Sequence, residues 1–160
     1  MSSSACTRNI SPASRYAPER PPVVNKPKLD HLLTRLSGYL GVLRDLGAVP
    51  AELFLADRDK IGNAKYHFVI AIECGIDIAN HLIASEGYRI PRDNGDSFAV
   101  LVENGIVPAE LKDSLMATAR FRNRLVHLYW DVDDRKIYEY LQTALGDLES
   151  LVRAVSARRW

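Results

Sequence analysis

Cysteine is scarce in this chain of 160 residues, in which only Cys6 and Cys74 are present. Two cysteines do not build the disulfide framework of a small secreted domain, and no cysteine or histidine cluster has the spacing of a zinc site. Cys74 falls in an apolar helical pattern, where a free thiol behaves as a small buried hydrophobe. We therefore expect a protein of the reducing cytoplasm that uses neither a metal nor another cofactor.

Long apolar runs are also missing from the sequence. We find no window that resembles the stretch of about 20 apolar residues needed to span a membrane, so no membrane partner is expected. The first residues contain serines and prolines but lack the apolar core of a secretory signal. This composition predicts a disordered head over residues 1–28, a helical domain over 29–157 and a short tail over 158–160.

An excess of charge of one sign is absent as well. The 21 lysines and arginines balance 20 aspartates and glutamates, which gives a formal net charge of +1. A protein that coats nucleic acid by bulk electrostatics carries a clear positive excess. Any site for RNA or DNA must therefore be local.

Apolar residues are present at helical spacing along most of the chain. Helices are predicted over about 29–47, 57–87, 108–130 and 133–155, with shorter helices near 52–56 and 97–104. Asp57 is placed to cap the start of the longest helix and Gly87 to end it, and its broad apolar face is typical of a central helix. No segment alternates as a strand does. The predicted fold is all-α, a mostly antiparallel bundle of four main helices plus one or two short helices.

Three polar residues lie along one stripe of the predicted central helix. Glu73, Asp77 and His81 follow one another at intervals of four, so they occupy one side of the helix. They form a solvated or interface stripe, or they face a basic segment opposite, where Glu73 or Asp77 orients an arginine or tunes a histidine.

The chemically densest stretch of the chain covers residues 119–130. Three guanidinium groups, those of Arg120, Arg122 and Arg124, precede the imidazole of His127 and the phenol of Tyr129. Guanidinium groups bind phosphate, and an imidazole transfers protons near pH 7. The plainer explanation is a solvated cationic helix end, which the helix dipole also favours.

The spacing within this stretch resembles a known family. Arg122 and His127 enclose four residues and Tyr129 follows two later, an Arg-x4-His-x-Tyr pattern similar to that of the HEPN superfamily and its HepT-like toxins. The runs 72–83 and 121–127 also look like segments of that family. The resemblance covers roughly residues 29–155.

The resemblance implies an activity and a set of roles. HepT-like toxins are metal-independent endoribonucleases that act as homodimers, with an arginine and a histidine from each subunit at a shared cleft. Carried over to this chain, Arg122 and His127 form the catalytic pair. The remaining assignments are phosphate binding by Arg120 and Arg124, orientation by Asn123, and orientation by Glu73 and Asp77.

The resemblance also implies a partner. In HepT-like pairs, a minimal nucleotidyltransferase antitoxin transfers AMP to the tyrosine of the motif, here Tyr129. The added charge and bulk would exclude RNA phosphate from the neighbouring pair. For Trp130 we expect a structural role in covering the end of the bundle.

Helix geometry places a demand on this motif. Five residues at about 100° each separate Arg122 from His127 by roughly 140°, so on a straight helix the two side chains point apart. Three explanations stay open: the helix unwinds before Tyr129, the pair meets across a dimer axis, or Arg120 is the true partner. We favour the first two together.

Two other functions are considered beside the ribonuclease. One is a non-catalytic helical subunit that binds nucleotide or presents substrate to a nucleotidyltransferase. The other is a dimerisation bundle without chemistry, in which the arginines are simply solvated.

Overall fold

The computed structural model describes residues 23–160, so most of the expected head lies outside the described residues. The helices are α1 (Lys26–Gly47), α2 (Ala51–Leu55), α3 (Arg58–Glu86), α4 (Asn94–Glu103), the 3-10 turn η1 (Ala109–Leu111), α5 (Lys112–His127), α6 (Asp134–Thr143) and α7 (Leu145–Ser156). Every regular element within residues 23–160 is helical, which confirms the predicted all-α fold.

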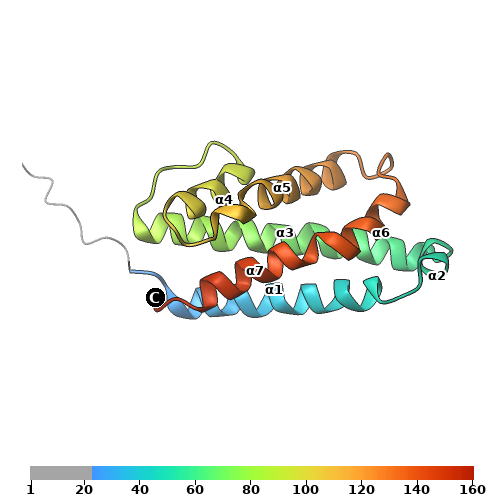
Figure 1. Ribbon diagram of the computed structural model, residues 1–160, viewed down its shortest axis with the longest axis horizontal. Helices are drawn as coiled ribbons and strands as arrows, with labels where there is room; N and C mark the ends of the chain where they lie inside the picture. Colours follow the sequence, from blue (N-terminus) through green and yellow to red (C-terminus); the bar gives the residue numbers. More distant parts are fainter. Residues whose placement is uncertain (1–22) are drawn as a thin grey trace, which may run out of the picture.

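The long helix α3 runs through the middle of the molecule (Figure 1). Helix α1 lies along one side of it, α4 and α5 lie on another, and α6 and α7 pack over α1. The pairing of α1 with α3 is antiparallel: the Cys74 thiol donates to the Leu32 carbonyl at 3.2 Å, and the rings of Tyr39 and His67 lie 6.2 Å apart. The core is therefore built around α3.

The ends of α3 follow from local chemistry, as the sequence predicts. The Asp57 carboxylate accepts hydrogen bonds from the backbone N–H groups of Asp59 and Lys60 at the start of the helix. At the other end Gly87 has φ 67°, a left-handed conformation that glycine adopts without steric cost.

Helix α4 begins earlier than predicted. The sequence suggests a loop through residues 94 and 95, but Asp93 caps a helix that already starts at Asn94, by accepting from the Asp96 backbone N–H at 2.8 Å. A Cβ added to Gly95 would lie 3.3 Å from Asp93 Oδ1 and 3.7 Å from the Met116 carbonyl oxygen. The tight contact is with the capping carboxylate, so the glycine leaves room for Asp93 beside the first turn of α4, and it does not mark a turn.

The predicted last helix is divided in two. Ala144 separates α6 from α7, yet its backbone stays in the right-handed helical region at φ −87° and ψ −19°, so the division is a kink. Two residues favour it: the Thr143 hydroxyl donates to the Glu139 carbonyl one turn back, and Gly146 is a weak helix former.

The sequence analysis expects no segment apolar enough to span a membrane, and by length and composition this expectation is wrong for α3. Helix α3 contains an 18-residue window with a mean hydropathy of 1.5, so it is long and apolar enough to cross a membrane by length and composition. Of that window, 61% is buried within the bundle. The hydropathy of α3 thus reflects the position of a core helix that other helices surround.

A buried carboxylate fixes the connection from α3 to α4. Asp96 is almost completely buried and accepts two hydrogen bonds from the Arg89 guanidinium, at 2.7 and 3.0 Å, and one from the Arg92 backbone N–H at 2.8 Å. Arg89 also pairs with Glu103 at the far end of α4. Hydrogen bonds from Arg89, followed by those from Arg92, hold the pKa of Asp96 well below its usual range.

We expect Asp96→Asn to lower the free energy of unfolding by roughly 2 kcal/mol at neutral pH, because the buried side chain that accepts from Arg89 and Arg92 then carries no charge. The pKa of Asp96 is depressed in the folded state, so its contribution is present above the unfolded value of about 4 and is lost as the pH falls toward the folded value. Chemical denaturation at pH 7 and pH 3 measures this. The gap between wild type and variant should narrow at pH 3; a constant gap would contradict the assignment.

Candidate functional site

The basic stretch occupies the last two turns of α5. This helix continues through His127, and its regular geometry ends at Leu128, which has φ −128° and ψ 39°. The Leu128 backbone N–H still donates to the Arg124 carbonyl at 2.8 Å. Arg122 and His127 therefore belong to the same uninterrupted helix.

The helix does unwind before Tyr129, but only after His127. Unwinding from Leu128 onward leaves the relative direction of Arg122 and His127 unchanged, at roughly 140° apart around the helix axis. Of the three explanations, local unwinding thus does not bring the pair together within one subunit. Convergence across a dimer axis and the use of Arg120 are the two that are left.

Arg122 points inward, toward α3. Its guanidinium forms an ion pair with Glu73, and its Nη1 donates to the Asn123 amide oxygen at 3.0 Å. The side chain is only 21% exposed, and within residues 23–160 its Nε has no hydrogen-bond partner. His127 is exposed at the end of α5, as are Arg120 and Arg124 on its surface.

The polar stripe of α3 divides between two neighbours. Glu73 faces α5 through its pair with Arg122, whereas Asp77 is exposed and lies toward Arg35 on α1. The Tyr39 hydroxyl, which accepts from Arg35, raises the pKa of Arg35, and the charge of Asp77 adds a smaller contribution. His81 is half-buried, and its Nε2 has no hydrogen-bond partner within residues 23–160.

After α5 the chain forms a short exposed turn. The Asp131 backbone N–H donates to the Leu128 carbonyl at 2.9 Å, which closes the turn around Tyr129 and Trp130. Trp130 is 91% exposed, so the expectation that it covers the end of the bundle is wrong. Its ring meets the Tyr129 ring edge-on, with centroids 5.5 Å apart, and Tyr129 is itself 37% exposed. The backbone of the turn directs the indole to solvent.

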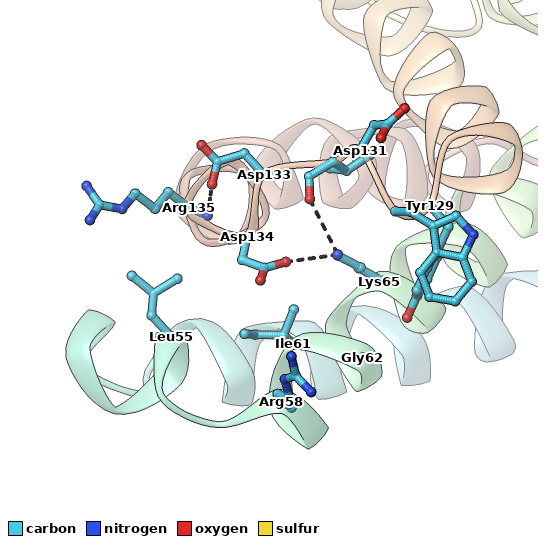
Figure 2. A pocket seen from close by; sticks show the side chains of 12 residues that line it. Leu55, Arg58, Ile61, Gly62, Lys65, Tyr129, Asp131, Asp133, Asp134 and Arg135 are labelled. Atoms are coloured by element: carbon cyan, nitrogen blue, oxygen red, sulfur yellow. Dashed lines mark hydrogen bonds and ion pairs between the residues drawn. The ribbon is translucent and has the colours of Figure 1, made fainter.

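A buried lysine holds this turn in place, and the sequence interpretation missed it. Lys65 of α3 pairs with Asp134 Oδ1 at 2.9 Å, donates to the Val132 carbonyl at 3.4 Å and lies 5.0 Å from the centroid of the Tyr129 ring (Figure 2). A cation at that distance from an aromatic face is attracted to it. The available signal was a lysine on the apolar face of a core helix, where an unpaired charge is not tolerated.

A pocket of about 780 Å³ opens beside Tyr129. Arg58, Gly62 and Lys65 line it from α3, at positions one and two turns apart on one face of the helix, and residues 129–135 line the other side (Figure 2). A Cβ added to Gly62 would lie 3.8 Å from the Tyr129 hydroxyl oxygen. The phenol hydroxyl thus lies over the glycine, at the wall of the pocket.

No group of three or more histidine, cysteine, aspartate or glutamate side chains is arranged to hold a metal ion among residues 23–160. Two of the carboxylates around the pocket have partners: Asp133 accepts from the Arg135 backbone N–H at 2.9 Å, and Asp134 pairs with Lys65. The site offers guanidinium, imidazole and phenol groups, which suit phosphate binding, proton transfer and attack on phosphorus.

We expect Lys65→Met to loosen the turn that carries Tyr129. Methionine keeps the apolar bulk of the lysine stem but removes the ammonium that joins α3 to Val132 and Asp134. Stability should fall by about 1–3 kcal/mol. Hydrogen exchange of the amides of residues 128–134 should accelerate. It should not accelerate in the control Lys60→Met, whose lysine pairs with Asp57 in the first turn of α3.

The chain matches the family model described as "Ribonuclease HepT-like" over residues 36–155. It is 32% identical over 85 residues to the mRNA nuclease HepT of Shewanella oneidensis, an alignment that covers 53% of this chain and 64% of that protein. It is 22% identical over 125 residues to the tRNA nuclease HepT of Aphanizomenon flos-aquae, covering 78% of this chain and 85% of that one.

The fold has a solved counterpart. A tri-AMPylated HEPN toxin of Shewanella oneidensis in complex with MNT antitoxin superposes with a TM-score of 0.74 at 22% identity, over 81% of this chain and 97% of that one. This similarity establishes the bundle architecture. The family match, which spans three quarters of the chain, confirms the family resemblance expected from the motif. The chain belongs to the family of HepT-like ribonucleases.

Proposed function

We propose that this protein is a metal-independent endoribonuclease toxin of the cytoplasm that works as a homodimer and is silenced by a nucleotidyltransferase partner. Support comes from the family match together with the Arg122 and His127 positions of the motif. The single observation that carries the proposal is the end of α5, where an exposed imidazole follows a guanidinium fixed by Glu73.

These groups are sufficient for RNA cleavage without a metal ion. The ribose 2′-oxygen attacks the adjacent phosphorus, a new O–P bond forms, and the bond to the 5′-oxygen of the next nucleotide breaks, which leaves a cyclic phosphate and a free 5′-hydroxyl. The 2′-hydroxyl loses a proton and the leaving 5′-oxygen gains one; His127 carries out one of these transfers, as base or as acid, and water carries out the other, while Arg122 stabilises the charge on the phosphoryl oxygens. Arg120, Arg124 and Asn123 lie beside this pair on α5, where they would bind the flanking phosphates.

A cleft shared between two subunits would bring an arginine and a histidine together although they point apart on one helix. Arg122 and His127 point apart on one regular helix, so if these two residues are the pair, the arginine of one subunit works with the histidine of another. The alternative, Arg120 as the partner of His127, needs no second subunit. Two exposed apolar side chains at the end of α5, those of Val126 and Leu128, offer a surface on which two copies can pack. Glu73 then acts as a positioning residue that fixes Arg122 toward α3.

We expect His127→Ala to reduce cleavage of single-stranded RNA by about 10²- to 10⁴-fold, because a general acid–base group is lost. The assay is done in EDTA with purified dimer, and circular dichroism checks the fold. Arg153→Ala, which removes an exposed arginine on α7, serves as the matched control and should cleave as wild type does. Unchanged cleavage by His127→Ala would sink the assignment; absence of cleavage in wild type would favour the non-catalytic subunit.

Mixing two inactive variants tests the shared cleft. If Arg122 of one subunit works with His127 of the other, a heterodimer of Arg122→Ala and His127→Ala contains one intact site and one doubly defective site. After subunit exchange, the mixture should recover about a quarter of the wild-type rate, as random pairing makes half of the dimers mixed. A mixture as inactive as its components, under conditions where light scattering shows exchanged dimers, contradicts pairing between subunits.

Tyr129 is the proposed off-switch. Its hydroxyl oxygen attacks the α-phosphorus of ATP bound to the partner, an O–P bond forms, the bond to the β-phosphate breaks, and pyrophosphate leaves while the phenol proton passes to solvent. The exposure of Tyr129 beside the end of α5 supports this role, since phosphate added there repels RNA from the basic stretch. The AMPylated state of the Shewanella toxin agrees with it.

Incubation with the nucleotidyltransferase partner and ATP should add the mass of one or more AMP units to wild type and abolish its cleavage of RNA. Tyr129→Phe should gain none and should stay active, because only the acceptor oxygen is removed. Intact-mass spectrometry gives the answer. If Tyr129→Phe still gains AMP, the acceptor is another residue. Tyr66→Phe, which removes the hydroxyl of another exposed tyrosine, is the matched control and should be modified as wild type is.

A further inference from the structure

We propose that the pocket between α3 and residues 129–135 is the seat of the nucleotide that Tyr129 carries: an adenosine monophosphate in phosphodiester linkage lies in the pocket, with its phosphate on Arg58 and its base on Trp130. The proposal rests on the proposed function of Tyr129 as the acceptor. Beyond naming the acceptor residue, it states where the attached nucleotide binds in the AMPylated, inactive protein.

The acceptor oxygen already lies at the pocket wall. Tyr129 lines the pocket, and its hydroxyl oxygen lies beside Gly62 of α3, where an added Cβ would be 3.8 Å away. Figure 2 shows the hydroxyl directed toward the α3 side of the pocket. Lys65, beneath the ring, limits the directions that the ring can take. A group attached to this oxygen is therefore directed into the pocket.

Three cationic side chains line the pocket: Arg58, Lys65 and Arg135. The Arg135 guanidinium points away from Tyr129, on the far side of Asp133 (Figure 2). Lys65 is occupied by Asp134 and the Val132 carbonyl. Arg58 lies one turn before Gly62 on the same face of α3, and no ion pair engages its guanidinium within residues 23–160. A guanidinium binds a phosphodiester through two parallel hydrogen bonds, so Arg58 suits the linkage better than a lysine does.

The base has a partner as well. A pocket of about 780 Å³ is of the size that small-molecule ligands occupy in proteins. The indole of Trp130, 91% exposed at the pocket rim, offers an aromatic face of the kind on which nucleobases stack. The proposal thereby explains an exposed indole that the bundle does not use: the modified protein covers it with adenine.

The test compares the modified protein with pocket variants. Wild type, Arg58→Gln and the control Arg153→Gln are modified by the nucleotidyltransferase partner with ATP, and a phosphodiesterase then releases AMP. Loss of the guanidinium should accelerate release about tenfold in Arg58→Gln, because the linkage leaves the pocket and becomes accessible. Release from Arg153→Gln should match wild type.

Fluorescence gives a second readout. The chain has two tryptophans, so Trp160→Phe leaves Trp130 as the reporter. Modification should quench its emission through stacking with adenine, and the quenching should be weaker when Arg58→Gln is added. Equal release rates together with unchanged emission overturn the pocket, even where intact mass places AMP on Tyr129 and the proposed off-switch stands.

A third outcome separates the two proposals. If intact mass shows no AMP on Tyr129, the off-switch fails, and titration of Trp160→Phe with free AMP decides the pocket. If AMP quenches Trp130, and if Arg58→Gln raises the AMP concentration needed for half of the quenching about tenfold, the pocket is a nucleotide site. Absence of quenching at millimolar AMP overturns the pocket.

Discussion

The burial of α3 is the constraint on which the rest of the structure depends. A helix surrounded by other helices tolerates a polar side chain only where a neighbour satisfies it. Three polar contacts of α3 show this: Glu73 pairs with Arg122, the buried Lys65 pairs with Asp134, and the exposed Asn80 accepts at 2.8 Å from the hydroxyl of Ser97, which is the buried member of that pair. His81, whose Nε2 has no hydrogen-bond partner within residues 23–160, is the exception. Each pair fixes one of the elements that surround α3, namely α5, the start of α6, and α4. The requirement to satisfy buried polar groups thus positions the functional end of the molecule.

The sequence predicted those parts of the fold that depend on local chemistry. The capping carboxylate of Asp57 and the left-handed Gly87 are decided within a few residues, so the bounds of α3 followed from the pattern. Gly95 misled, because a glycine that makes room for a helix cap has the same identity as one that permits a turn. The difference lies in the carboxylate of Asp93, which here caps a helix, although aspartate is common in caps and in turns alike.

The site was predictable in part, for the same reason. The motif indicated Arg122, His127 and Tyr129 as neighbours in sequence, and helix phase showed that the first two diverge. Which side of α3 faces α5 is a tertiary fact, so Glu73 and Asp77 could not be separated before the structure placed Asp77 toward Arg35. Lys65 was missed because its partners lie 67 residues and more along the chain. Its burial on an apolar face was the only local sign.

Lys65 and Glu73 are residues of one rigid helix, and this sets the distance between Arg122, the proposed catalytic arginine, and Tyr129, the proposed acceptor. Eight residues of α-helix correspond to about 12 Å, a spacing that does not depend on the length of the turn between α5 and α6. A residue inserted in that turn would be absorbed at the surface, since Lys65 still holds its far end. A residue inserted in α3 between the two would rotate one anchor by about 100° relative to the other. In families of this architecture, length variation should therefore accumulate in the exposed turn and be excluded from the core helix, although the turn carries Tyr129.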